Sequence, residues 1–154
     1  MVETPSREYA VRERRLMRIG EALQDFLRNV EAARDQAARE QNLHPTDFAC
    51  IGYLFRVGVP VSPKQIISRM NLSSGSGTAL LDRLQSLGYT RRLPNPDDRR
   101  SVLIELDQRA AAEPLKRYLE LEESYRRATD QFSDEDLEVI AEFVSKISTL
   151  TSET

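Results

Sequence analysis

The sequence predicts a mostly α-helical fold with one small β-hairpin. Apolar residues recur every three to four positions over most of the chain, whereas only residues 89–106 contain β-rich runs separated by turn residues. Charged residues make up 31% and aromatic residues 6%, which suits a helix-rich protein with much solvated surface. The 154 residues suffice for one compact domain, or for a small domain with long helical extensions.

The first expected helix covers residues 9–39. A stripe of apolar residues with a spacing near 3.5 runs along it, without proline and with a single glycine. A stripe of this length needs a partner surface, and packing inside its own domain and packing on a second copy of the chain are both open at this point. The stripe consists of Leu16, Ile19, Leu23, Phe26, Leu27, Val30, Ala33 and Ala37.

Two shorter helices are expected next. Pro45 suits a first helical turn, where its missing N–H costs nothing, and Gly58 closes this second helix. The third helix begins with Ser62 as N-cap, Pro63 in the first turn and Gln65 as the capping-box partner. The expected buried residues are Phe48, Ile51, Tyr53, Leu54 and Phe55 in the second helix and Ile66, Ile67 and Met70 in the third, after which Asn71 can adopt the left-handed conformation.

The fourth helix starts from a linker-like segment, SSGSG at residues 73–77. Ser73 is its expected N-cap, and Gly88 its stop. Two glycines weaken a helix by roughly 1 kcal/mol each relative to alanine, so tertiary packing must offset this cost. The buried side is expected to consist of Leu80, Leu81, Leu84 and Leu87.

A hairpin and two more helices complete the chain. The β-rich runs Tyr89–Leu93 and Val102–Leu106 flank the segment PNPDDRRS, whose proline, asparagine and aspartate residues favour a long, charged turn. A helical pattern resumes from Asp107 to about Gln131, and Pro114 should kink or delay that helix. Ser133 and Asp136 cap the last helix, and the apolar faces are Leu115, Tyr118, Leu119 and Tyr125 in one helix and Leu137, Ile140, Val144 and Ile147 in the other.

The third helix, the tight turn and the fourth helix form a helix-turn-helix, and the hairpin makes it winged. In this motif the start of the second helix enters the major groove of DNA. Gly75 and Gly77 would let the backbone approach bases or phosphates closely, and free N–H groups at a helix start favour a phosphate. The hydroxyls of Ser74, Ser76 and Thr78 can reach base edges. The alternative is an ordinary flexible turn before a core helix.

The distribution of charge agrees with this interpretation. The net charge is -3, but residues 61–106 carry seven Lys or Arg against four Asp or Glu. A polyanion would therefore meet the middle of the chain. Arg91, Arg92, Arg99 and Arg100 on the hairpin suit phosphates and a narrow minor groove, although a charged turn is also often only solvated.

Composition excludes several other classes. No apolar run has the length of a membrane span, and MVETPSREYA lacks the apolar core of a signal peptide. Cys50 is the only cysteine, so an internal disulfide is excluded and a reducing cytoplasm is the expected location. With one histidine and one cysteine, neither a zinc site nor a catalytic constellation is expected. We therefore expect no cofactor, no metal and no enzymatic activity.

These residues resemble the multiple antibiotic resistance regulator (MarR) family of winged-helix transcription factors over nearly the whole chain. The resemblance is strongest from Leu43 to Leu106, through LHPTDF, SPKQIISRMNLSSGSGTALLDRLQSLGY and the wing motif Asp98-Arg99-Arg100 followed by SVLIEL. It implies an N-terminal dimerisation helix in residues 1–42, a winged helix-turn-helix DNA-binding domain in residues 43–107 and C-terminal dimerisation helices in residues 108–154. A homodimer would then bind a pseudo-palindromic operator on double-stranded DNA.

The resemblance also assigns roles to residues. Arg100 would insert in the minor groove, Asp98 would orient it, and the start of the fourth helix would read the major groove. Members of the family are mostly repressors released by small aromatic or lipophilic ligands, and others respond to cysteine oxidation. Together with the reasoning above, the expected DNA-binding residues are Ser62, Lys64, Ser73, Ser74, Gly75, Ser76, Gly77, Thr78, Arg83, Arg91, Arg92, Asp98, Arg99 and Arg100.

Some positions depart from the family pattern. Ala79 and Leu80 stand where the recognition helix often carries a cation, which keeps a winged-helix protein–protein adaptor without DNA binding as the alternative function. Cys50 is expected to act as a small buried hydrophobe rather than as a redox sensor. From family geometry, a ligand cleft is expected from Arg14, Arg18, His44, Tyr53 and Arg56.

Overall fold

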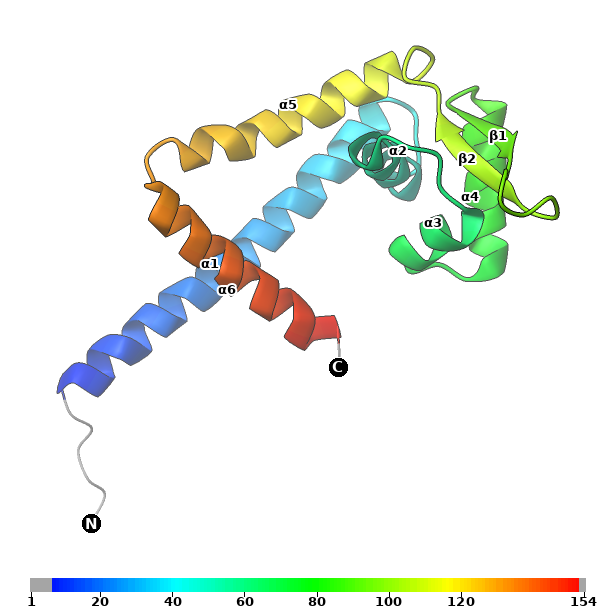
Figure 1. Ribbon diagram of the computed structural model, residues 1–154. Helices are drawn as coiled ribbons and strands as arrows, with labels where there is room; N and C mark the ends of the chain where they lie inside the picture. Colours follow the sequence, from blue (N-terminus) through cyan, green and yellow to red (C-terminus); the bar gives the residue numbers. More distant parts are fainter. Residues whose placement is uncertain (1–6, 153–154) are drawn as a thin grey trace. The chain divides into compact units, whose positions relative to one another are not determined.

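The computed structural model describes residues 7–152, and these form helices and a single two-stranded hairpin (Figure 1). This confirms the predicted fold class. The residues up to Arg117 and those from Tyr118 onward form two compact units. The elements are α1 (Arg7–Glu40), α2 (Pro45–Val57), α3 (Pro63–Arg69), α4 (Ser74–Ser86), β1 (Thr90–Pro94), β2 (Val102–Leu106), α5 (Ala112–Thr129) and α6 (Asp134–Ser152).

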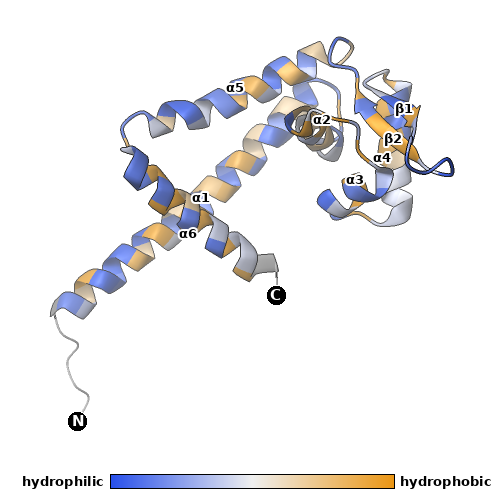
Figure 2. Cartoon of the chain, in the orientation of Figure 1, coloured by the Kyte–Doolittle hydropathy of each residue, from blue (hydrophilic) through white to orange (hydrophobic). Residues whose placement is uncertain are grey.

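Helix α1 is much longer than the core that it contacts. Its last turns pack on α2, where Ala37 and Ala38 are fully buried. The expected apolar stripe is present along the rest of the helix (Figure 2), but most of it is in contact with water. Leu16, Phe26 and Leu27 are 48%, 49% and 59% exposed. The helix therefore carries an apolar face that a single chain leaves largely uncovered.

The ends of α2 and α3 agree with the predicted Gly58 stop and the predicted capping box, and His44 adds an N-cap. His44 is the N-cap of α2, because its Nδ1 accepts a hydrogen bond from the backbone N–H of Thr46 at 3.2 Å, and Gly58 ends the helix with φ of 70°. Ser62 and Gln65 form the predicted capping box at the start of α3. Asn71 takes the predicted left-handed conformation with φ of 51°.

Helix α4 completes the core of the winged part. The Oγ of Ser73 accepts the backbone N–H of Ser76 at 3.2 Å, which confirms the predicted N-cap. Leu80, Leu81 and Leu84 are buried as expected. The prediction was wrong for Leu87, which is 49% exposed, because the helix ends at Ser86 and Leu87 forms the C-cap.

The hairpin is held to the helices by a third segment. Strands β1 and β2 pair antiparallel with Thr90 opposite Leu106, and β1 begins one residue later than predicted. Ile104, at the centre of β2, is 1% exposed and exchanges both backbone hydrogen bonds with Val61, at 3.0 and 2.7 Å. This bridge fixes the wing next to the residues that lead into α3.

The two C-terminal helices begin where local signals indicate. Pro114 lies in the first turn of α5, so the helix is delayed from Asp107 to Ala112. Ser133 and Asp136 cap α6 reciprocally, with side chain to backbone distances of 3.1 and 3.3 Å. Among the described residues, no helix is both long and apolar enough to cross a membrane. Neither α5 nor α6 has more than a few buried residues among those that the structure describes.

Candidate nucleic-acid interface

The turn of the helix-turn-helix depends on a close approach between α3 and α4. Gly77 is buried, and a Cβ atom added there would lie 2.7 Å from Cδ1 and 3.3 Å from Cβ of Ile67. The missing side chain of Gly77 therefore makes room for α3, and a contact of this residue with DNA stays a prediction. Gly75 differs, since it is exposed and has no atom within 4 Å of such a Cβ position.

The first turns of α4 present a row of small hydroxyl groups to water. Ser73, Ser74, Ser76 and Thr78 are all exposed. Ser73 donates its hydroxyl to the Oγ of Ser76 at 3.0 Å, and Thr78 donates to the backbone carbonyl of Ser74 at 2.9 Å. The Ser74 hydroxyl has no hydrogen bond to any residue that the structure describes. This end of α4 thus offers short donors and acceptors on an open surface, as the sequence predicted.

Arg83 has a different role from the one predicted. Its Nε and Nη2 donate to the two carboxylate oxygens of Asp47 on α2, at 3.0 and 2.7 Å. The side chain of Asp47 is 3% exposed, whereas that of Arg83 is 46% exposed. These hydrogen bonds and the charge of Asp47 raise the pKa of Arg83. Two of the three guanidinium nitrogens are therefore engaged by Asp47, although the side chain remains partly exposed.

The two arginines on β1 form ion pairs on the surface. Arg91 lies 2.9 Å from a carboxylate oxygen of Glu105, and Arg92 lies 2.7 Å from one of Asp82 on α4. All four side chains are at least one-third exposed, so water and salt screen the pairs and each contributes little to stability. Both arginines can exchange these partners for a phosphate at small cost.

The tip of the wing is shaped by hydrogen bonds from side chains to the backbone. Asp98 Oδ1 accepts the backbone N–H of Arg100 at 2.9 Å, and Asn95 Oδ1 accepts that of Asp97 at 3.0 Å. Asp98 therefore acts on the main chain at Arg100, whereas we expected it to act on the side chain. Among the described residues, neither Arg99 nor Arg100 has a carboxylate within ion-pair distance, and both are exposed.

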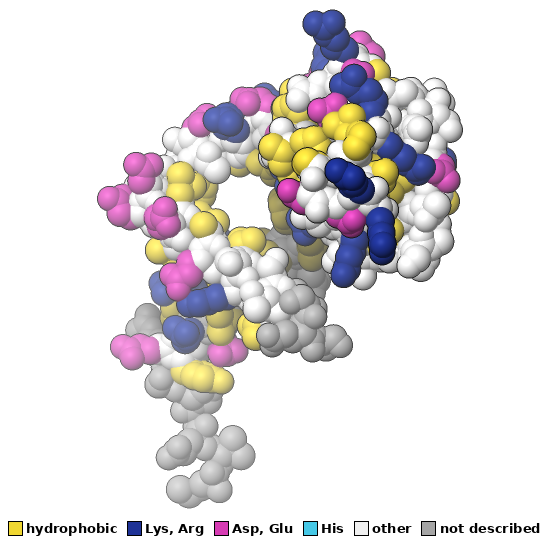
Figure 3. Space-filling model, turned by 45° about the vertical axis from the view of Figure 1, so that its right-hand side comes forward, with side chains coloured by type: hydrophobic (Ala, Val, Ile, Leu, Met, Phe, Trp, Pro, Cys, Tyr) yellow, Lys and Arg dark blue, Asp and Glu magenta, His cyan; other side chains and the backbone are white. Residues whose placement is uncertain are grey.

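Two predicted residues lie at the start of α3. Lys64 is exposed in the first turn. The Ser62 hydroxyl accepts the N–H of Gln65 at 3.3 Å and donates to its Oε1 at 2.9 Å, so its first role is the cap. Lys and Arg side chains stand out on the winged part in Figure 3. The exposed cations and hydroxyls of α3, α4 and the wing thus belong to one small unit of structure.

The predicted ligand cleft does not form within one chain. Arg14 and Arg18 lie in the first half of α1, and Arg18 is 22 residues before the end of that helix, or about 33 Å along its axis. His44 caps α2 beyond that end, and Tyr53 and Arg56 lie on α2. An uninterrupted helix holds the two groups apart in the single chain, so a common cleft stays a prediction.

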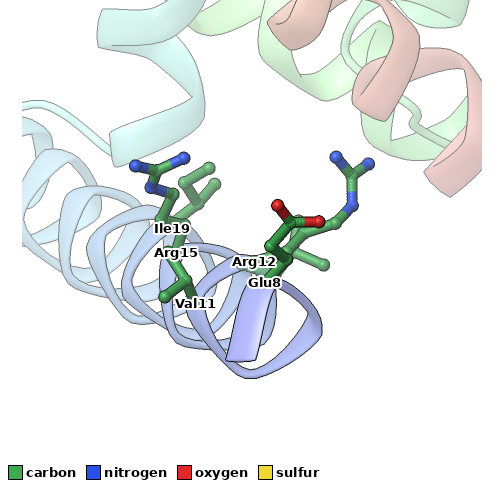
Figure 4. Close-up of a pocket in the computed structure, with 6 residues that line it drawn as sticks. Glu8, Val11, Arg12, Arg15 and Ile19 are labelled. Atoms are coloured by element: carbon green, nitrogen blue, oxygen red, sulfur yellow. The ribbon is translucent and has the colours of Figure 1, made fainter. Parts of the chain in front are cut away.

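A shallow hollow lies instead along the first turns of α1. Figure 4 shows side chains of Glu8, Val11, Arg12, Arg15 and Ile19 projecting from the helix around it, and Leu16 completes the lining. All of these residues come from three successive turns of one helix. The hollow combines apolar side chains with two guanidinium groups, but a single helix encloses no ligand.

Cys50 lies in the interior, as the sequence predicted. It is 0% exposed, and burial, together with the nearby charge of Asp47, raises the pKa of its thiol to about 12. A thiol in this state stays protonated at neutral pH, and the thiolate is the reactive form. This environment does not favour oxidation.

Comparison with known proteins identifies the family. A model described as MarR family matches residues 41–101. An uncharacterized HTH-type transcriptional regulator of Bacillus subtilis, YcgE, is 35% identical over 118 residues, which is 76% of this chain and 75% of that protein. The chain belongs to the MarR family. The HTH-type transcriptional regulator PecS of Dickeya dadantii is 32% identical over 109 residues, 70% of this chain and 66% of that protein.

Solved structures of MarR-family proteins share the fold. Streptococcus pneumoniae FabT in complex with DNA has a TM-score of 0.71 and 19% identity, covering 90% of this chain and 98% of that one. The regulator MarR of Oenococcus oeni has a TM-score of 0.68 and 20% identity, covering 88% and 99%. The curated relatives are transcriptional regulators, so the chain is a MarR-family regulator and not an enzyme, as predicted.

Asp47 is the residue of this region that the sequence did not reveal. An aspartate in the first turn of a helix usually interacts favourably with the helix dipole, and Asp47 occupies such a position in LHPTDF. Nothing in this segment indicates a further partner. Its partner is 36 positions away in the sequence, on another helix. No local pattern connects the two, and only the packing of α2 against α4 does.

Proposed function

We propose that this protein is a dimeric, sequence-specific DNA-binding repressor of transcription. The observation that carries the proposal is the exposed row of hydroxyls at the start of α4 together with the exposed Arg99 and Arg100 on the wing. Exposed hydroxyl groups can bond base edges, and guanidinium groups that lack a carboxylate can bond phosphates. The DNA complex of FabT, which has the same fold, supports this assignment.

The proposal gives the two elements different tasks. The first turn of α4 reads base edges in the major groove through Ser74, Ser76 and Thr78. The wing tip contacts the backbone or the minor groove through Arg99 and Arg100, and Lys64 adds a phosphate contact from the first turn of α3. Ser73 and Gly75 let the main chain of α4 approach the DNA.

Two copies of the chain would bind one pseudo-palindromic operator. The apolar faces of α1 and α6, each exposed in the single chain, supply surface for a homodimer interface. Two winged parts then contact successive half-sites, roughly 34–36 Å apart on the duplex. The proposal places the protein in the cytoplasm, with the DNA that it controls.

Release by a small aromatic or lipophilic ligand is a further part of the proposal. The hollow on α1 pairs Arg12 and Arg15 with apolar side chains, a combination that suits an aromatic carboxylate once a second wall is present. Calorimetric titration with salicylate, with and without operator DNA, tests this part. Binding heat and a lower affinity for DNA are expected, and the absence of both would contradict it.

The first test is a gel-shift series with the DNA upstream of the protein's own gene, comparing wild type with Arg100→Ala. Wild type should shift this fragment at concentrations that leave random DNA free. Arg100→Ala should bind more weakly to every sequence and flatten the slope of log affinity against log salt by about 0.9, the value for one phosphate contact.

The control is Arg127→Ala, which removes the same charge from an exposed position on α5. It should behave as wild type. If wild type shifts neither this fragment nor sequences selected from a random pool, the proposal fails.

One observation favours a second function, that of a protein–protein adaptor. Recognition helices often carry a cation near their middle, but Ala79 is small and Leu80 is fully buried here, so neither can bond a base. A DNA-binding protein making several phosphate contacts loses affinity steeply as salt rises, whereas an adaptor has no such dependence. The salt series above therefore separates the two functions.

A further inference from the structure

The pair formed by Asp47 and Arg83 is the strongest polar link between α4 and the rest of the winged part. Nε of Arg83 donates to Oδ2 of Asp47 at 3.0 Å, and Nη2 donates to Oδ1 at 2.7 Å. A bidentate pair of this kind fixes direction as well as distance, because the two parallel hydrogen bonds hold the planar groups in one plane. The Asp47 end is buried at the start of α2, and α2 itself packs on α1.

Apart from this pair, α4 is held by the apolar packing of its buried leucines and by contacts with α3 and β1, and among the described residues none of these is a buried hydrogen bond with a fixed direction. The helix touches α3 where Gly77 meets Ile67, and β1 through the exposed pair of Asp82 with Arg92. The first contact is apolar and contains no directional hydrogen bond, and the second is screened by water. Arg83 lies nine residues after Ser74, about 13 Å along the axis, so a shift of the helix at Arg83 displaces its first turn.

We propose that Asp47 is a positioning residue of the DNA interface, which acts through Arg83 to hold α4 in the pose that presents its first turn to the bases. This inference rests on the proposed DNA-binding function. It removes Arg83 from the set of phosphate ligands and adds a residue that cannot touch DNA, since Asp47 is 2% exposed.

The sign of the charge change makes the inference testable. Asp47→Asn removes a negative charge from a protein that binds a polyanion, so electrostatics alone predicts equal or tighter binding. Positioning predicts the opposite. An asparagine retains one acceptor but cannot accept both hydrogen bonds, so α4 loses its fixed direction. Affinity for the operator should fall about tenfold, the cost of one lost base contact, while affinity for random DNA and the salt slope stay unchanged.

Asp82→Asn is the matched control. It makes the same chemical change on α4 itself and breaks the pair with Arg92, but both partners there are exposed, at 58% and 42%. Removing the charge of Asp82 should not weaken DNA binding, and losing an exposed ion pair should not shift α4. The variant should therefore bind the operator as tightly as wild type or more tightly. A tenfold loss with Asp47→Asn beside no loss with Asp82→Asn supports the inference. Equal behaviour of the two variants overturns it.

Hydrogen exchange without DNA provides a second, independent readout. In Asp47→Asn the amides of α4 should exchange faster relative to those of α1 and α2, whereas Asp82→Asn should leave the pattern unchanged. If exchange in α4 is the same in wild type and Asp47→Asn, the inference fails even if DNA binding falls. If wild type binds no DNA at all, the proposed function fails instead, and the positioning role fails with it.

Arg83→Lys covers the case in which Asp47→Asn does not fold. The lysine keeps a positive charge beside the buried carboxylate, but it cannot donate the two parallel hydrogen bonds. A phosphate ligand tolerates this exchange of one cation for another, so unchanged operator affinity would overturn the inference. A fall in the ratio of operator to random-DNA affinity, at an unchanged salt slope, supports positioning.

Discussion

At the scale of single residues, two glycines two positions apart have different reasons to be present. Gly77 faces Ile67 across the α3–α4 contact, and Gly75 faces open space. Neither has a positive φ, so backbone freedom explains neither of them. The neighbours in space, and not the residue type, decide which glycine supports packing and which lies on the exposed surface.

This difference leads to opposite predictions for alanine. Gly77→Ala should destabilise the protein by about 1–3 kcal/mol, because the new methyl group overlaps Ile67, whose β-branched side chain has little freedom to move. Gly75→Ala should stabilise it by about 0.5–1 kcal/mol through helix propensity. Urea unfolding measures both. Equal effects at the two sites would show that the α3–α4 contact is looser than described.

Ile67→Ala offers a direct check on the cause. In the Gly77→Ala background it removes the atoms that the new methyl group meets. The double variant should then cost less than the sum of the two single substitutions, because the overlap is removed. Simple addition of the two effects would contradict the steric explanation.

The buried thiol of Cys50 predicts a dependence of stability on pH. Its pKa is about 12 in the folded protein and close to its ordinary value of 9.0 in the unfolded chain. As pH rises, the thiol therefore loses its proton first in the unfolded state. The contribution of Cys50 to the free energy of unfolding is complete below pH 9 and is lost as pH rises toward 12. Unfolding midpoints in urea should fall over this range for wild type and fall less for Cys50→Ala.

The thiol should also resist alkylation. At pH 8 the folded protein should react with iodoacetamide far more slowly than the urea-unfolded protein, because both access and thiolate formation are blocked. Equal rates would contradict the buried placement of Cys50.

At the scale of elements, the proposed function divides specificity and affinity between α4 and the wing. The start of α4 carries neutral hydroxyls, whose hydrogen bonds depend on which base they meet, and the wing tip carries cations, whose attraction to phosphate does not. The two elements are also held differently. Helix α4 is tied to α2 by a half-buried pair, whereas the wing tip is an exposed turn built on Asn95 and Asp98.

The division predicts distinct effects of serine and arginine variants. Ser74→Ala or Ser76→Ala should change the order of preferred operator sequences by about 1–3 kcal/mol at one position, with little effect on random DNA. Arg100→Ala should weaken all sequences alike. Binding selections from a random pool followed by titration measure both. Equal losses on operator and random DNA for all three variants would contradict the division.

At the scale of the whole molecule, much of the apolar surface of the described residues belongs to α1 and α6. Leu27 on α1 is 59% exposed, and Val139 and Leu150 on α6 are each 67% exposed. Apolar surface of this extent usually marks an interaction site in a folded protein. The exposure is the observation on which the proposed homodimer rests.

A charge placed on this face should dissociate the dimer. Leu27→Glu should shift sedimentation from dimer toward monomer, because a carboxylate would be buried without a partner in the interface. Gln24→Glu is the control, since it adds the same charge to an exposed polar position one turn away. A wild type that sediments as a monomer at micromolar concentration would contradict the homodimer itself.

Local signals determined much of this protein from sequence alone. The helix starts at Ser62, Ser73 and Ser133, the left-handed Asn71 and the charged hairpin all follow from side chains that bond their own neighbours. Periodicity identified the buried leucines of α4 for the same reason, since a face repeats within one element. The start of the helix that the proposal places on DNA was thus predictable, and so was the family.

Only the tertiary structure decided which residues of the candidate site face each other. It brings Gly77 against Ile67 and Arg83 against Asp47, and it places most of α1 between Arg14 or Arg18 and the start of α2. The physical reason is that these relations join residues far apart in the chain or on different elements. Side-chain chemistry limits the contacts that an arginine or a glycine can make. The packing of α2, α3 and α4 determines which of these contacts Arg83 and Gly77 form.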